Sequence, residues 1–175
     1  TAGEIRFRGR DLVQLTQSEL RRLRWSEIAM VPQSAMNGFD PVYTVEQQLD
    51  EAILAHAALP AAERRKRIAE LFAMVGLGDS RLKDYPHQFS GGMRQRAMIA
   101  MALALDPTLI VADEPTTGLD VIVQDQILHR IKAIHAELNK TMLLITHDMA
   151  VVAENCDKIV VMYAGKVMEY GGGGG

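Results

Sequence analysis

Two apolar runs joined by a helical pattern constrain the fold of this chain more than any other feature. Thr108–Ala112 and Met142–Ile145 are nearly continuous apolar runs, and apolar residues recur at helical spacing from Ile127 to Leu138 between them. Such runs are typical of strands buried on both faces of a parallel sheet, whose strands are joined by crossover helices. The sequence therefore predicts an α/β core with Lys158–Tyr163 as a third strand.

Composition narrows the class of protein. The chain has 175 residues, of which 48% are hydrophobic and 23% charged, and its net charge of -3 gives no indication of a nucleic-acid partner. The longest apolar run, Ala97–Leu105, is far shorter than the roughly 20 residues of a membrane-spanning helix, so we expect any role at a membrane to depend on a partner. Cys156 is the single cysteine, which excludes an internal disulfide and suits a reducing compartment.

The first 43 residues indicate a small β piece. Residues 4–8 and 27–31 have the pattern of short strands, and Ser18–Arg24 is predicted to form a basic helix between them. Gln33–Tyr43 is rich in proline, asparagine and glycine, which predicts a loop.

A helical segment is predicted next. Thr44, with Gln47 three residues later, has the pattern of a capping box. Pro60 suits the first turn of a second helix, and Gly76 suits its end. The basic run Glu63–Arg67 lies on this second helix, where it forms either a solvated face or a contact with acidic groups of a partner.

Adjacent acids follow the first apolar strand. Asp113 and Glu114 stand at its carboxyl end, which is the edge of an α/β sheet where ligands bind. One carboxylate can hold Mg²⁺, and the next can orient or deprotonate an attacking water. Alternatively, the two acids simply cap the following turn.

A glycine pair opens the helix that begins near Ser90. Gly91 and Gly92 allow a ligand to approach the backbone closely, and the N–H groups at a helix start favour an anion. The alternative is an ordinary glycine turn with a serine cap. Two isolated polar residues follow other strands: His147 could donate to a phosphate oxygen, and Gln33 could bind water or a hydrated metal, although either residue alone is as easily structural.

The order and spacing of these segments resemble the ABC ATPase family over essentially the whole chain. Ser90–Gln95 is similar to the family's signature motif, Asp113–Glu114 to its Walker B acids and Gly118–Asp120 to its D-loop. Gln33 matches the Q-loop glutamine and His147 the switch histidine.

Further segments resemble the importers of dipeptides, oligopeptides and nickel within that family. These segments are Val31–Asn37, Asp40–Thr44, Tyr85–Gln95 and Asp120–Gln124. The signature departs from the general Leu-Ser-Gly-Gly-Gln pattern at Phe89 and Met93, and methionine at the second of these positions is usual in the importer group.

The resemblance implies a partial P-loop NTPase core with a parallel sheet, a helical subdomain and a small β edge piece. The division it implies is a β-subdomain and Q-loop remnant at 1–33, a helical subdomain at 34–95, the C-terminal part of the ATPase core at 96–170 and a polyglycine tail at 171–175.

The implied activity is ATP hydrolysis with ATP and Mg²⁺ in the site. The resemblance assigns catalysis to Glu114 and His147, metal binding to Asp113 and Gln33, and nucleotide contacts to Gln33, Ser90, Gly91, Gly92, Gln95 and Asp120. Two subunits, identical or different, would sandwich the nucleotides, with Ser90 and Gly92 closing over the γ-phosphate held by the other subunit. Asp120 would link the two sites.

The implied partners are the membrane permease subunits and, indirectly, an extracellular solute-binding protein, with no nucleic acid. The subunit is expected at the cytoplasmic face of the cell membrane. The cargo is not encoded in these motifs, because in this family the permease and the binding protein select it.

The phosphate-gripping motif G-x-x-x-x-G-K-[ST] does not occur among the 175 residues. The family places that motif before the region equivalent to Thr1, so we expect the chain to be a fragment that cannot bind ATP alone. Two alternatives to a transport ATPase subunit stay open: a non-catalytic fragment, and a soluble ABC ATPase of DNA repair or translation. The short helical insert argues against the second alternative.

Overall fold

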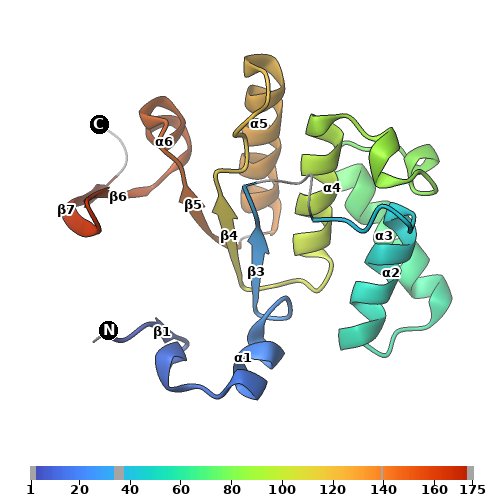
Figure 1. The fold of residues 1–175 in the computed structure, drawn as a ribbon, viewed down its shortest axis with the longest axis horizontal. Helices are drawn as coiled ribbons and strands as arrows, with labels where there is room; N and C mark the ends of the chain where they lie inside the picture. Colours follow the sequence, from blue (N-terminus) through green and yellow to red (C-terminus); the bar gives the residue numbers. More distant parts are fainter. Residues whose placement is uncertain (1–2, 34–37, 139, 173–175) are drawn as a thin grey trace.

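A three-stranded parallel sheet lies at the centre of the fold (Figure 1). The computed structural model describes residues 3–33, 38–138 and 140–172. The sheet has the order β3-β4-β5, formed by β3 (Ile28–Val31), β4 (Leu109–Asp113) and β5 (Thr141–Ile145). The predicted parallel α/β core is therefore confirmed, and its strands end at a common edge.

The two faces of this sheet differ in their surroundings. One face packs against α4 (Gly91–Leu103) and α5 (Val121–Leu138), and four of its residues are at most 2% exposed: Ala29, Val31, Ile110 and Ala112. On the other face Met30 and Leu143 are 46% and 51% exposed. The prediction that β4 and β5 are buried on both faces is therefore wrong, because among the described residues helices cover one face.

The N-terminal segment forms a hairpin and a short helix. β1 (Arg6–Phe7) pairs antiparallel with β2 (Arg10–Asp11), and both turn residues, Arg8 and Gly9, have positive φ. A two-residue turn of this kind matches the twist of a tight hairpin. The strand expected at residues 4–8 is therefore shorter than predicted, since it covers only Arg6–Phe7 before the chain turns at Arg8. A 3₁₀ turn (Leu12–Gln14) and α1 (Gln17–Leu23) follow.

The helical subdomain consists of α2 (Val45–His56), α3 (Ala61–Met74) and the start of α4. The capping box is confirmed, because the Thr44 hydroxyl accepts from Gln47 N–H while the Gln47 side chain accepts from Thr44 N–H. Two 3₁₀ turns, Asp79–Arg81 and Pro86–Gln88, connect α3 to α4. Leu49, Ile53, Ile68 and Phe72 are fully buried between these helices. Helix α4 continues past the predicted boundary at residue 95, so one helix belongs both to the subdomain and to the layer that covers the sheet.

The C-terminal strands form a separate hairpin. After α6 (Met149–Asn155), β6 (Lys158–Tyr163) pairs antiparallel with β7 (Lys166–Gly172) across the turn Ala164–Gly165, in which both φ angles are positive. The expectation that Lys158–Tyr163 joins the parallel sheet is wrong, because among the described strands β6 pairs with β7, which the tight turn brings directly beside it.

The predicted polyglycine tail begins inside β7. Gly171 pairs with Ile159, and Gly172 pairs with Lys158. Backbone ladder bonds need no side chain, so glycine can extend a strand. Residues 173–175 lie outside the described part, as do residues 34–37 of the importer-like segment. Among the helices that the structure describes, none combines the length and apolarity required to cross a membrane.

Candidate functional site

Polar residues stand at three strand ends along the carboxyl edge of the sheet. Gln33 follows β3, Asp113 is the last residue of β4, and His147 follows β5. Glu114 comes directly after Asp113. The parallel register places these strand ends beside one another, which is why residues far apart in the sequence share one location.

The carboxylate of Glu114 is the centre of this cluster. Gln33 Nε2 donates to Glu114 Oε2 at 2.9 Å, and Thr117 Oγ1 donates to the same oxygen at 2.7 Å. His147 Nδ1 lies 3.3 Å from Glu114 Oε1. The structure thus brings together three residues singled out from the sequence and adds Thr117.

The backbone at Glu114 is held in an unusual conformation. Its φ is 43°, in the left-handed region that side chains other than glycine rarely adopt. Glu114 N–H donates to the carbonyl of Ile145 at 2.8 Å, and Glu114 carbonyl accepts from Thr117 N–H at 3.2 Å. Left-handed backbone costs about 1–2 kcal/mol, and these two hydrogen bonds retain it. The side chain is thereby directed toward Gln33 and His147 instead of continuing the strand.

Hydrogen bonding keeps this carboxylate ionised. The Thr117 hydroxyl contributes most to lowering the pKa of Glu114, followed by the His147 ring and with a smaller share from Gln33. Glu114 is therefore a carboxylate at neutral pH, with lone pairs available to accept from a water. The His147 side chain is 76% exposed, so its ring can also be reached by a ligand.

The donor atoms at this edge fit a hydrated Mg²⁺ better than an all-protein metal cage. Among the described residues, no three His, Cys, Asp or Glu side chains gather as such a cage would require. Mg²⁺ bound with a nucleotide uses one or two carboxylates, phosphate oxygens and water. Asp113 and the amide oxygen of Gln33 offer oxygens of that kind.

The glycine pair lies in a second position, at the start of α4. Ser90 caps this helix, since its Oγ accepts from Met93 N–H at 3.3 Å. Gly92 is buried, whereas Ser90 is exposed. Gln95 is 3% exposed, so its side chain is buried, and its Nε2 has no hydrogen-bond partner among the residues that the structure describes.

The loop after Glu114 ends in a helix cap. Asp120 Oδ1 accepts from Val123 N–H at 3.0 Å at the start of α5, and Gln124 Nε2 donates to the carbonyl of Thr116 at 3.0 Å. Asp120 therefore fixes the end of this loop at the start of α5. Both Asp120 and the nearby Gly118 are exposed.

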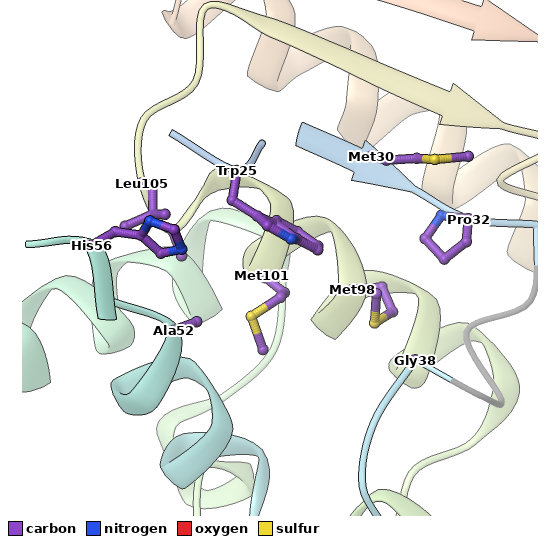
Figure 2. A pocket seen from close by; sticks show the side chains of 10 residues that line it. Trp25, Met30, Pro32, Gly38, Ala52, His56, Met98, Met101 and Leu105 are labelled. Carbon is purple, nitrogen blue, oxygen red and sulfur yellow. The ribbon is translucent and has the colours of Figure 1, made fainter. Parts of the chain in front are cut away.

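An apolar groove of about 460 Å³ lies on another side of the subdomain junction (Figure 2). It is lined by Trp25 and Met30 from the sheet side, by Ala52 and His56 of α2, and by Met98, Met101 and Leu105 at α4. The backbone of Trp25 has a φ of 68°. Its N–H donates to the Ile28 carbonyl at 2.8 Å, which holds the indole at this groove.

Sequence reasoning missed Thr117 and the groove. Thr117 stands three residues after Glu114, and a hydroxyl at that spacing can bond back across a turn, which was the available signal. The groove residues come from four separate segments, and no local pattern unites them.

A protein-family model described as ABC transporter matches residues 1–117. The dipeptide transport ATP-binding protein DppD of Bacillus subtilis is 47% identical over 173 residues, which is 98% of this chain and 52% of that protein. DppD of Escherichia coli is 48% identical over 97% of this chain and 53% of its own length. The chain thus spans about half the length of the curated relatives it matches.

Two solved structures resemble the fold throughout. The ATP-binding cassette MJ0796, a dimer in a post-hydrolysis state bound to ADP and phosphate, has a TM-score of 0.87 at 31% identity, covering 100% of this chain and 75% of that one. The structure of cbiO1 from Clostridium perfringens, part of the complex cbiONQ, has a TM-score of 0.87 at 28% identity, covering 98% and 66%.

Proposed function

This chain belongs to the ABC transporter family, and we propose that it is part of the ATP-hydrolysing subunit of a peptide importer. Within that subunit it supplies the residues that activate the water for attack on ATP. The observation that carries this proposal is the Glu114 carboxylate, which accepts from Gln33 and Thr117 and contacts His147 at the carboxyl edge of the sheet. Phosphoryl transfer depends chiefly on positioning and electrostatics, and a prearranged ionised carboxylate supplies both.

The residues at this edge of the sheet have different proposed roles. Glu114 orients and polarises the attacking water through its carboxylate. His147, being exposed, donates from its ring to an oxygen of the γ-phosphate. Gln33 and Asp113 would hold the oxygen shell of Mg²⁺, which, when bound, neutralises charge on the phosphates.

The second position, at the start of α4, serves the opposing subunit. A solved relative of similar fold is a dimer bound to ADP and phosphate. In a dimer of this kind Ser90, Gly91 and Gly92 would close over the γ-phosphate held by the other subunit, as the helix start favours an anion. Asp120, exposed in the loop between the two positions, would face the partner. The buried Gln95 would support this helix from within.

Peptides are the proposed cargo class. The relatives at 47% and 48% identity are named as dipeptide transport proteins, and a third, from Bacillus subtilis, is an oligopeptide transport protein at 44% identity. These names favour transport over a soluble role in repair or translation.

The apolar groove at Trp25 is the proposed docking site for the permease. A transport ATPase must transmit movement to a membrane subunit, and this groove joins the Gln33 strand to the helical subdomain (Figure 2). Its apolar lining suits an amphipathic helix of the permease, in the manner of helix-in-groove recognition. The subunit would thus be held at the cytoplasmic face of the membrane.

The test compares wild type with Glu114→Gln in the intact protein purified with its permease. We expect the variant to retain binding of a fluorescent ATP analogue with Mg²⁺ and to lose hydrolysis by about 10²-fold or more. Glu51→Gln, which alters an exposed glutamate of α2, is the matched control and should hydrolyse ATP normally. Undiminished hydrolysis by Glu114→Gln would remove the basis of the proposal.

A further inference from the structure

The glycines that open α4 lie against the start of α5. A side chain added at Gly92 would place its Cβ closer than 3.0 Å to Val123 Cγ1, and one added at Gly91 would lie 3.1 Å from Leu119 Cδ2. Gly91 and Gly92 lie within the regular helix α4, so their backbone conformation does not demand glycine. What requires glycine at these two positions is the close approach of the Leu119 and Val123 side chains.

Val123 is itself held firmly. Its N–H donates to Asp120 Oδ1 at 3.0 Å, and the neighbouring Gln124 N–H donates to the Asp120 carbonyl at 2.9 Å. Val123 packs partly buried against the core, whereas Val121, two residues earlier on the same helical turn, is 79% exposed. Val123 thus presents its γ-carbons to Gly92 from a capped helix start.

Separate local hydrogen bonds order the segment between this contact and the proposed catalytic carboxylate. Thr117 Oγ1 donates to Glu114 Oε2 at 2.7 Å, and Leu119 N–H donates to the Thr116 carbonyl at 3.3 Å. Asp120 then caps α5 at Val123. Ten residues, Glu114–Val123, therefore carry the carboxylate at one end and the support for the glycine pair at the other.

We propose that Val123, assisted by Leu119, is a positioning residue that sets the start of α4 relative to Glu114, and that position 92 requires glycine because of Val123. This inference rests on the proposed function, since it deepens the roles of Glu114 and the glycine pair. Val123 touches no reacting atom. It acts by keeping the two parts of the site, which serve opposite nucleotides, in one fixed geometry.

A double-mutant cycle tests the contact by thermal unfolding of the intact protein, without any need for hydrolysis. We expect Gly92→Ala to lower Tm by about 5 °C, because the added methyl group overpacks against Val123. In the Val123→Ala background the same substitution should leave Tm unchanged or raise it, since alanine is the better helix former once room exists. Val121→Ala is the matched control, and Gly92→Ala should cost as much in that background as in wild type.

Hydrolysis tests the positioning role separately. We expect Val123→Ala to reduce kcat about tenfold while the KM for ATP stays within about twofold, because misplacement affects the reacting geometry more than nucleotide capture. Additive Tm changes in the cycle would overturn the contact, and an unchanged kcat would overturn the positioning role. If the wild-type protein does not hydrolyse ATP, the proposed function fails, and the Tm cycle still decides whether Val123 accounts for Gly92.

Discussion

Gln33 and Glu114 are 81 positions apart in the sequence, and Gln33 Nε2 donates to Glu114 Oε2 at 2.9 Å. The bond joins the residue that follows β3 to the residue that follows β4, two strands paired in parallel register. The bond thus connects the side chain of Gln33 to the carboxylate that we propose activates water. Met30 of β3 and Pro32, the residue before Gln33, both line the apolar groove. The end of β3 therefore contributes residues to the groove and, through Gln33, to the cluster around Glu114.

Replacing Thr117 with valine should alter the pH dependence of hydrolysis. The Thr117 hydroxyl contributes most to the lowered pKa of Glu114, so its loss raises that pKa. Because Glu114 must be ionised to accept from water, the acidic limb of the kcat/KM profile should move to higher pH, while the carboxylate stays ionised at neutral pH in both proteins.

The control for Thr117→Val is Thr116→Val. Thr116 contributes its backbone carbonyl, which accepts from Gln124, and that bond survives the substitution. An acidic limb that stays in place in Thr117→Val, or moves equally in both variants, would contradict the assignment.

Removing the charge of Asp50 should weaken the helical subdomain more at neutral pH than in acid. Arg64, from the basic run, donates from Nε and Nη2 to the two carboxylate oxygens of Asp50 at 2.6 and 3.0 Å, and from Nη1 to the Leu59 carbonyl at 2.7 Å. The Arg64 hydrogen bond lowers the pKa of Asp50. A lowered folded-state pKa stabilises the protein above the unfolded value of about 3.9, and this contribution is lost as pH falls through the folded value.

Thermal unfolding at pH 7 and at pH 3 measures this effect. Asp50→Asn should have a lower Tm than wild type at pH 7, and the deficit should narrow at pH 3. Glu51→Gln, an exposed change on the same helix, should show little deficit at either pH. An equal deficit for Asp50→Asn at both values would mean that its charge is not what stabilises α2 against α3.

Alanine at Gly76 should destabilise the protein through the backbone. Gly76 ends α3 with a φ of 71°, and an added Cβ would lie 3.1 Å from Arg130 Nη2. The left-handed conformation should cost about 1–2 kcal/mol, or a Tm decrease of about 2–8 °C. Gly78→Ala is the matched control, because its φ is -81° and the space around it is open to 3.7 Å, so its effect should stay within about 0.5 kcal/mol. Equal Tm values for the two variants would argue against backbone strain.

Local signals in the sequence determined the helix limits of the subdomain. The Thr44 and Gln47 capping box, the end of α3 at Gly76 and the Ser90 cap all occur as predicted, because each depends on atoms within four residues of one another. The motif order likewise determined the family, since each motif is a contiguous stretch of residues.

Tertiary structure alone decided how these pieces meet. The cluster of Gln33, Thr117 and His147 around Glu114 depends on parallel register and on a left-handed turn at Glu114, neither of which a residue pattern encodes. An apolar run does not state how many of its faces are covered, which is why β5 was expected to be buried and is largely exposed. The contact between Gly92 and Val123 joins two helix starts that are 31 positions apart, and packing between helices, not the sequence of either one, sets it.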